Sequence, residues 1–409
     1  MSNTKRIFPL EGVVQHYNWG GNDFIPTLLN IPVIEEKPFA EYWLGAHQNA
    51  SAEVSVDDKE NIKLIDIIQK SPASTLGEYV NHQFGKLPYL LKVLDVKDML
   101  SIQVHPSKES AKLGFETENL KNIALNDPNR NYKDDNHKPE LMVALSDFWL
   151  LHGFKTPDQL ARIFKTVPEL NFLQASFEQS GYLGLYQTVM EMPQEGINER
   201  LKPLLENIVP AYELNELNKS SEDFWAARAA KTFNKKDKID RGIFSIYLFN
   251  LVYLKPGEAI FQDAGIPHAY LEGQNMEIMA NSDNVLRGGL TLKHIDVQEL
   301  LKHIKFEPTI PKIILGEKIN DDAEYIFKSP AQDFQLSEIR LSSGKSLRLT
   351  VSTAEIFLVL EGTGSFQHDG TSMTVAKGAS VLSLPGAELK IQSTRPMVIF
   401  RATVPYSHS

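Results

Sequence analysis

The stretch Ser101–Ala111, SIQVHPSKESA, decides the predicted fold. In a β-strand, residues two apart project from the same face, so a strand here would place the Gln103 amide beside the His105 imidazole. The apolar run before it, residues 87–102, is long enough for two β-segments broken near residues 95–98. This pattern indicates an inner strand of a β-sandwich. A Gln-x-His pair by itself is more often an ordinary hydrogen-bonded pair than a metal site, so a metal prediction needs further ligands.

Composition limits the class of protein. The 409 residues are too many for one ordinary core, so two or three domains are expected. The net charge of -10 argues against nucleic acid as a partner, and the absence of cysteine means that a metal would be held by nitrogen and oxygen atoms. No apolar stretch approaches the roughly 20 residues of a membrane span, and the first residues lack the apolar core of a signal peptide. We therefore expect a cytoplasmic protein.

Two further stretches add candidate ligands. A dense polar run, residues 131–138, leads straight into an apolar strand with Glu140 just inside it. Burying an unpaired carboxylate is costly, so Glu140 needs a partner, which a metal or a salt bridge to Lys138 would supply. His268 occupies a similar place, after a proline at the start of an apolar strand. An isolated strand histidine is usually a core residue and an isolated arginine such as Arg287 is usually solvated, but packing explains the combination poorly.

The periodicity of the chain changes twice. From Thr156 to about Lys231 helical spacing replaces β-like alternation, and Thr156 followed by Pro157 is typical of a helix start. Strands are expected to resume at Gly242–Phe261. Beyond about Leu301, short strands with glycine turns are typical of a second jelly roll.

Two long motifs carry a family resemblance. Residues 131–140, NYKDDNHKPE, and residues 268–293, HAYLEGQNMEIMANSDNVLRGGLTLK, resemble the two signatures of the type I mannose-6-phosphate isomerase family, zinc enzymes of the cupin superfamily. The first motif matches at every fixed position. The second departs at Gly288, where alanine is usual, and at Leu292, where proline is usual. Both departures concern the shape of the backbone beside the pocket.

The resemblance extends to Trp19 and to residues 41–45 and 100–106. It implies one zinc ion per chain, held by Gln103, His105, Glu140 and His268. Two imidazoles, one carboxylate and a neutral amide leave the ion with a net positive charge, so it can polarise a carbonyl or hydroxyl oxygen. The implied reaction interconverts mannose 6-phosphate and fructose 6-phosphate through an enediolate.

The resemblance also implies the roles of other residues. Arg287 corresponds to the family's catalytic arginine, whose fork of donors suits an enediolate or a phosphate. Glu277 and Lys138 are the candidates for proton transfer, and a role supporting the metal ligands is the alternative for Lys138. The expected substrate contacts are Trp19, Ser101, Tyr270 and Lys293, of which Ser101 and Lys293 would contact the phosphate. A packing role is the alternative for Trp19.

The predicted fold class is mainly β with an α-helical insertion, in which two cupin-type jelly-roll β-sandwiches accompany a helical domain. A catalytic cupin domain, residues 1–153 and 241–305, is interrupted by an inserted helical domain, residues 154–240. Residues 306–409 form a C-terminal cupin-like domain. Its only histidine before the tail, His368, is expected in a hairpin turn, so this domain should lack a metal site and pack against the catalytic domain.

Two other functions share parts of this pattern. A non-catalytic, sugar-phosphate-sensing metal cupin would have little reason to keep Arg287, Lys138 and Glu277 together. An iron cupin oxygenase would need open positions for oxygen, so the bound metal and oxygen consumption would distinguish it. The isomerase is preferred because two long motifs converge on one metal-assisted chemistry. We expect a monomer that acts on a small sugar phosphate in carbohydrate metabolism, with no membrane partner.

Overall fold

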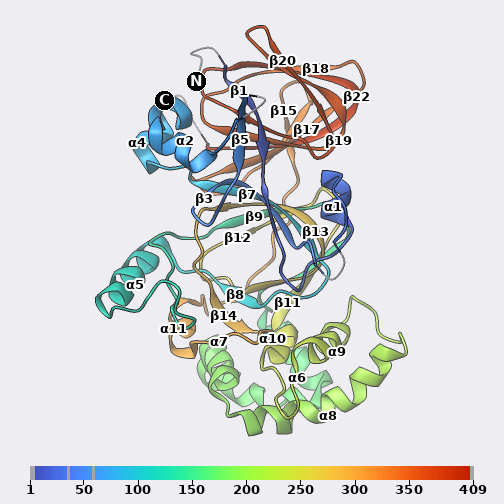
Figure 1. Ribbon diagram of the computed structural model, residues 1–409. Coiled ribbons are helices and arrows are strands. Elements are labelled where there is room, and N and C mark those ends of the chain that lie inside the picture. Colours follow the sequence, from blue (N-terminus) through green and yellow to red (C-terminus); the bar gives the residue numbers. More distant parts are fainter. Residues whose placement is uncertain (1–4, 35–36, 58–59, 406–409) are drawn as a thin grey trace.

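The computed structural model describes residues 5–34, 37–57 and 60–405. Figure 1 shows three stacked parts: a C-terminal β-part at one end, a central β-part and a helical part at the other end. Within the described residues, the strands form two 11-stranded sheets. The predicted fold class, mainly β with an α-helical insertion, is confirmed.

The central sheet contains the strands of both motifs. Its strands are β2 (Val13–Gln15), β3 (Glu41–His47), β4 (Ala50–Ser51), β7 (Tyr89–Val96), β8 (Ile102–Val104), β9 (Glu140–Ala144), β10 (Phe148–Phe154), β11 (Phe249–Leu254), β12 (Ala259–Gln262), β13 (His268–Ala280) and β14 (Leu286–Gly289). The main path has the order β11-β10-β13-β7-β3-β2. Strand β7 is buried along its whole length between β3 and β13, so the predicted inner strand is confirmed.

The second sheet is built mainly from the C-terminal part of the chain. Its strands are β1 (Ile7–Glu11), β5 (Glu53–Asp57), β6 (Glu60–Lys63), β15 (Glu317–Ile319), β16 (Glu324–Phe327), β17 (Gln335–Leu341), β18 (Ser346–Thr350), β19 (Glu355–His368), β20 (Thr371–Ala376), β21 (Ser380–Ser383) and β22 (Glu388–Thr403). Strand β1 pairs with β21 and β5, so residues near the N-terminus complete this sheet. The first 153 residues thus contribute to both sheets, and the domain boundaries given above stay a prediction.

The helical part lies between β10 and β11. Its helices are α6 (Pro157–Thr166), η1 (Pro168–Leu170), α7 (Leu173–Glu191), α8 (Gln194–Glu213), α9 (Glu222–Phe233) and α10 (Gly242–Leu248). Thr156 and Gln159 form a capping box, which confirms the predicted helix start. The strand expected from Gly242 was wrong, because residues 242–248 form α10 and β11 begins at Phe249. Every residue of α10 is buried, so its apolar run has no period that distinguishes helix from strand.

The remaining helices lie outside the helical insertion. They are α1 (Phe24–Leu29), α2 (Leu64–Lys70), α3 (Pro72–Leu76), α4 (Glu78–Phe84), α5 (Lys108–Leu120) and α11 (Val297–His303). Ser107 caps α5 by accepting a hydrogen bond from the Ser110 N–H. None of the helices in the described ranges is long and apolar enough to cross a membrane.

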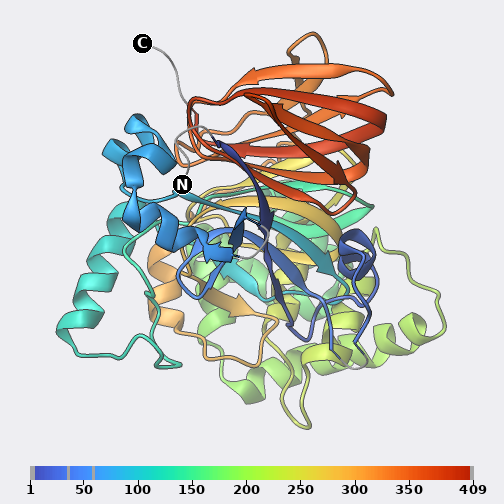
Figure 2. The ribbon, with the colours of Figure 1, turned by 45° about the horizontal axis from the view of Figure 1, so that its top comes forward.

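Alternation along β13 divides its side chains between two cores. Met276 and Ile278 pack with Ile356 and Phe400 in the core between the two sheets, which lie face to face in Figure 2. Tyr270 instead lies in a smaller core inside the central part. Successive strand residues face opposite sides of a sheet. Glu277 therefore faces the interior of the central part, whereas Met276 and Ile278 face the core between the two sheets.

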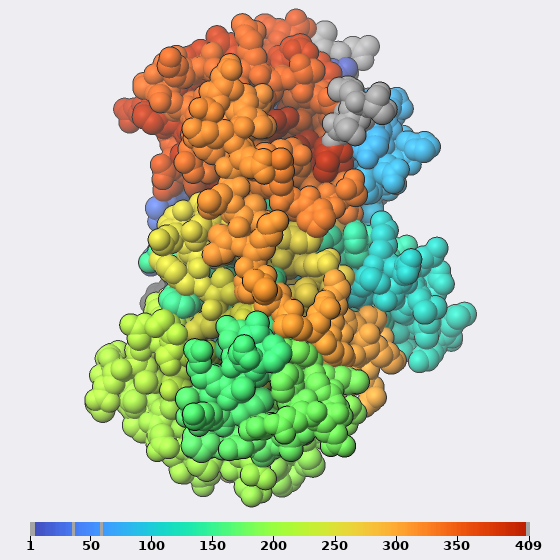
Figure 3. Space-filling view, turned by 180° about the vertical axis from the view of Figure 1, so that it is seen from behind, coloured from blue at the N-terminus to red at the C-terminus, as the bar shows by residue number. Residues whose placement is uncertain are grey.

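The segment that follows α11 connects all three parts. Figure 3 shows it crossing the back of the central part toward the C-terminal sheet. Bridges from Phe154 to Pro308 and from Ala259 to Ile314 attach it to the central sheet.

Candidate metal centre and active site

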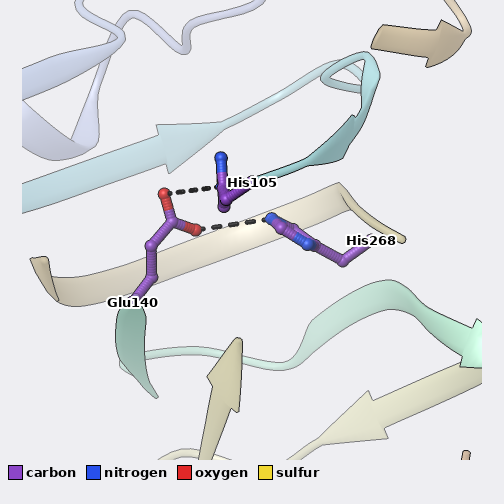
Figure 4. A group of neighbouring side chains, drawn as sticks. All are labelled: His105, Glu140 and His268. Atoms are coloured by element: carbon purple, nitrogen blue, oxygen red, sulfur yellow. Dashed lines mark ion pairs between the residues drawn. The ribbon is translucent and has the colours of Figure 1, made fainter. Parts of the chain in front are cut away.

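Three ligand-type side chains from separate strands meet inside the central part (Figure 4). Glu140 begins β9, His268 begins β13, and His105 directly follows β8. Their ligand atoms lie within 4.8 Å of one another and all three residues are buried. The Glu140 carboxylate lies between the rings, with Oε1 3.4 Å from His105 Nε2 and Oε2 3.4 Å from His268 Nε2. The fold therefore brings together three predicted ligands that are far apart in the sequence.

Strand register also brings Gln103 to this cluster. Gln103 on β8 is the direct antiparallel partner of His268 on β13. Directly opposed residues project from the same face of a sheet. Gln103 also lines a small chamber that Glu140 and His268 line as well. Its amide oxygen is thus available as a fourth ligand.

Backbone carbonyls orient both imidazoles. His105 Nδ1 lies 3.0 Å from the Asn284 carbonyl oxygen, and His268 Nδ1 lies 2.9 Å from the Ile266 carbonyl oxygen. A neutral imidazole that donates from Nδ1 keeps a lone pair on Nε2. Burial lowers the pKa of His105 to about 4, so its ring is neutral at pH 7. Both Nε2 atoms therefore face the Glu140 carboxylate as potential ligand atoms.

The cluster fits a zinc ion. Among the described residues, His105 Nε2 is a buried polar atom with no hydrogen-bond partner, although it lies close to a carboxylate. A buried polar atom without a partner is costly, and a metal ion at this point would provide one. Imidazole nitrogens with carboxylate and amide oxygens, and no thiolate, match the ligand types of catalytic zinc sites.

Lys138 keeps the Glu140 carboxyl ionised. Burial alone would raise the pKa of Glu140, but the Lys138 ammonium opposes burial, and the pKa lies well below its usual range. Lys138 Nζ lies 3.3 Å from Glu140 Oε1. The salt bridge that the sequence offered as an alternative to a metal is therefore present together with the histidine cluster.

Lys92, which the sequence analysis did not single out, joins two buried carboxylates. Its Nζ lies 3.4 Å from Glu41 Oε2 and 3.3 Å from Glu277 Oε1, and it stands 5.0 Å from the centre of the Trp43 ring. The available signal was the single lysine in the buried strand YLLKVLDV, because a buried charge requires a partner.

Glu277 is a buried carboxyl that titrates near neutrality. Burial and the nearby Glu140 carboxylate raise its pKa to about 7, against the opposing effect of Lys92. The Tyr270 hydroxyl donates a 2.9 Å hydrogen bond to Glu277 Oε2. A carboxyl group with this pKa can both accept and release a proton at neutral pH.

A cavity of about 550 Å³ opens beside the cluster. Six of the predicted residues line it: Trp19, Ser101, Gln103, Lys138, Arg287 and Lys293. A smaller chamber of about 50 Å³ is lined by Gln103, Lys138, Glu140, His268, Tyr270 and Glu277. Gln103 and Lys138 belong to both linings, so the chamber adjoins the cavity. Apart from His105, which completes the cluster, every predicted site residue lines one of these two spaces.

Arg287 and Lys293 give the cavity a cationic side. Neither has a carboxylate partner within the described part of the chain. Burial lowers the pKa of Arg287, and burial together with Arg287 lowers the pKa of Lys293. Two neighbouring cations without counter-charges, Arg287 partly buried and Lys293 exposed, favour an anionic group in the cavity.

Asn284, also missed in the sequence analysis, joins the two motifs. Its Nδ2 donates 2.8 Å hydrogen bonds to the carbonyl oxygens of Asp134 and Asn136, and its Oδ1 accepts from the Lys133 N–H at 2.7 Å. Its own carbonyl oxygen is the partner of His105 Nδ1. The buried Asn284 amide thus fixes the loop before Glu140 and the carbonyl that orients His105.

Two stacked jelly-roll sheets with a His-Glu-His cluster inside one of them define a metal-binding protein of the cupin superfamily. The family model "Phosphomannose isomerase type I, catalytic domain" matches residues 7–157. The mannose-6-phosphate isomerase of Salmonella typhimurium is 35% identical over 371 residues, covering 90% of this chain and 92% of that protein. The chain belongs to the type I phosphomannose isomerase family.

More distant relatives and solved structures agree with this assignment. The human mannose-6-phosphate isomerase is 32% identical, with 97% of this chain and 98% of that protein covered. A zinc-bound crystal structure of a mannose 6-phosphate isomerase has a TM-score of 0.87 and 31% identity, covering 98% of this chain and 100% of that chain. A crystal structure of a mutant phosphomannose isomerase from Salmonella typhimurium has a TM-score of 0.88 at 32% identity, with the same coverage. The predicted cupin-type fold is confirmed.

Proposed function

We propose that the protein is a zinc-dependent aldose-ketose isomerase that interconverts mannose 6-phosphate and fructose 6-phosphate. The observation that carries this proposal is the buried His105-Glu140-His268 cluster, with Glu277 in the same small chamber and two cations without counter-charges in the adjoining cavity. The names of the relatives support the substrate, and the zinc-bound related structure supports the metal. We propose one zinc ion per chain, with Gln103 as the fourth protein ligand.

The reaction moves one proton from C2 to C1 of the aldose and one proton from O2 to O1, so no atom is gained or lost. Zinc bound at the cluster would supply Lewis-acid polarisation of the reacting carbonyl or hydroxyl oxygen. Glu277 is the proposed proton carrier, because its pKa of about 7 allows it to accept the C2 proton and return it to C1. Tyr270 and Lys92 hold its carboxyl group in place.

The cationic residues have separate proposed tasks. Arg287 donates hydrogen bonds to the negative oxygen of the enediolate, where a fixed donor acts mainly on the transition state. Lys293 and Ser101 bind the phosphate, and Trp19 forms a wall for the sugar ring. Lys138 keeps Glu140 ionised, and its position in both cavity linings also suits proton transfer at the sugar oxygens.

We further propose a monomer that works in the cytoplasm on a free sugar phosphate. The net charge of -10 supports a small-molecule substrate over nucleic acid. A phosphorylated sugar carries a charge that keeps it in the compartment where it is made, which supports the cytoplasm.

The direct test is to incubate the zinc-loaded protein with mannose 6-phosphate and measure fructose 6-phosphate. We expect saturable formation of fructose 6-phosphate, the reverse reaction from fructose 6-phosphate, and no oxygen consumption. Unphosphorylated mannose is the matched control, because it lacks the anion that the cationic side of the cavity would bind. Absence of fructose 6-phosphate from reactions with fully zinc-loaded protein would refute the proposed function.

A further inference from the structure

The segment that joins Arg287 to Lys293 has an unusual backbone. Leu290 has φ of 52° and Gly289 has φ of 135°, both in the region that favours glycine. A leucine in this conformation persists only where the surrounding structure holds it. This segment forms one side of the cavity, which Leu290 and Lys293 line together with Arg287. The groups that hold residues 290 and 291 therefore affect the position of Lys293, which follows two residues later.

The principal holding group is Asp240, which belongs to neither motif. Its Oδ1 accepts hydrogen bonds from the N–H groups of Gly242 at 2.7 Å and Leu290 at 2.8 Å. Its Oδ2 accepts from the Thr291 N–H at 3.2 Å. Asp240 lies in the connection between α9 and α10, two residues before α10 begins. One carboxylate thus fixes the start of α10 and the segment after Arg287.

The two backbones also touch. A Cβ built on Gly289 would lie 2.4 Å from Gly242 Cα, and one built on Gly242 would lie 2.5 Å from the Leu290 nitrogen. A Cβ built on Gly288 would lie 2.7 Å from the Tyr186 hydroxyl on α7. The helical insertion therefore occupies the space that an alanine would need at position 288. Glycine at position 288, where the family motif usually has alanine, thus goes together with close packing of this segment against the helical insertion.

A further hydrogen bond links the segment held by Asp240 to Lys293. The Lys293 N–H donates to Thr291 Oγ1 at 3.1 Å, and Thr291 is held in turn by Asp240. We propose that Asp240 is a positioning residue for substrate binding. It fixes the position of Lys293 and thereby the anion-binding side of the cavity. This inference rests on the proposed function, because it assigns the recognition of the substrate phosphate to a contact made by the helical insertion.

The test compares the full-length, zinc-loaded variants Asp240→Ala, Asp240→Asn and Asp237→Ala. Asp237 is an exposed aspartate in the same connection, so its substitution is the matched control. Three quantities are measured: kcat and KM for mannose 6-phosphate, the Kd of inorganic phosphate, and hydrogen-deuterium exchange of residues 286–293. Asparagine keeps one oxygen that can accept hydrogen bonds from Gly242 and Leu290 but loses the carboxylate charge. Asp240→Asn therefore tests whether these hydrogen bonds alone restore substrate binding. It also replaces Asp240→Ala if that variant does not fold.

We expect Asp240→Ala to raise KM and the Kd of phosphate by about tenfold or more, because small displacements of binding groups have effects of this order. We expect kcat to stay within about threefold, the zinc content to stay unchanged, and residues 290–291 to exchange faster. Asp240→Asn should lie between Asp240→Ala and the wild type. A wild-type KM and wild-type exchange in Asp240→Ala would overturn the proposal, and so would a loss of kcat or zinc without a change in KM. Failure of the wild type to isomerise mannose 6-phosphate would refute the proposed function alone, because phosphate binding and exchange still test Asp240.

Discussion

Tyr270 and Glu277 lie on the same strand, β13, and the Tyr270 hydroxyl donates a 2.9 Å hydrogen bond to Glu277 Oε2. The other carboxyl oxygen of Glu277 lies 3.3 Å from Lys92 Nζ. A hydroxyl and an ammonium thus hold this carboxyl group inside the chamber that contains Glu140 and His268. The arrangement fixes the orientation of a group whose pKa lies near neutrality.

The first prediction concerns the proton carrier. Glu277→Gln should lower kcat/KM by about 100-fold or more, the usual contribution of a positioned general base. Glu277 acts as a base only when it is deprotonated, so wild-type kcat/KM should rise with pH through its pKa. That pKa is about 7 without metal, and the positive charge of bound zinc lowers it further, so the limb should lie at or below pH 7.

The pH profiles of two variants check this assignment. Glu277→Gln should lose the acidic limb from its residual activity. Tyr270→Phe removes a hydrogen bond to the charged form of Glu277, so its limb should move to higher pH. An acidic limb that is unchanged in Glu277→Gln would assign the titration to another group.

The second prediction concerns the metal ligands. His268→Ala should lose zinc and activity while circular dichroism shows a folded protein, because the ring is lost from the metal cluster and the strand remains. His368→Ala is the matched control. His368 ends β19, and its Nδ1 contacts only the Glu388 carbonyl oxygen, at 3.2 Å, among the described residues. Zinc content and turnover should be normal in His368→Ala, and wild-type turnover by metal-free His268→Ala would contradict the assignment.

The third prediction concerns Arg287. If Arg287 stabilises charge only as the enediolate forms, Arg287→Ala should lower kcat by about 100-fold or more, with a much smaller rise in KM. Arg348→Ala, at an exposed position of β18, should leave both constants unchanged. Steady-state kinetics of the two variants make the comparison. A rise in KM with little change in kcat would instead assign Arg287 to the phosphate.

The fourth prediction concerns Asn284. Asn284→Ala keeps the carbonyl that orients His105 but removes the side-chain hydrogen bonds that fix the loop before Glu140. Loss of such supporting contacts typically weakens metal binding by about 10- to 100-fold, and we expect this loss in a competition titration with a chelator. Asn129→Ala, at an exposed position of the preceding loop, is the control. Equal zinc affinities for the two variants would show that Asn284 does not support the cluster.

The candidate metal ligands could be picked out from the sequence because each one marks a break in a local pattern. Gln103 and His105 end an apolar run, and Glu140 and His268 each follow a proline at the start of one. Strand pairing places Gln103 beside His268, whereas Glu140 is paired with Met279 and meets His268 across the interior of the central part. The motif resemblance then identified the chemistry that the ligand types alone left open.

Other parts of the site depend on contacts that have no local signal. The partners of Lys92 come from β3 and β13, so its role depends on the order of strands in the sheet. Asp240 is one acidic residue among many in a polar connection, and its role appears only when α10 meets the segment after Arg287. The strand expected from Gly242 was wrong because the local sequence also lacks a signal there. Residues 242–248 are buried on all sides of α10, so their apolar run shows no helical period.

Titration of zinc into the metal-free protein, with fructose 6-phosphate formation followed at each addition, tests the central claim most directly. We predict no activity without metal, a linear rise to one equivalent of zinc per chain and a plateau beyond it, with Glu140→Ala inactive throughout. Activity in the metal-free protein, a plateau at two equivalents, or one equivalent of zinc retained by Glu140→Ala would contradict a single catalytic zinc ion held by His105, Glu140 and His268.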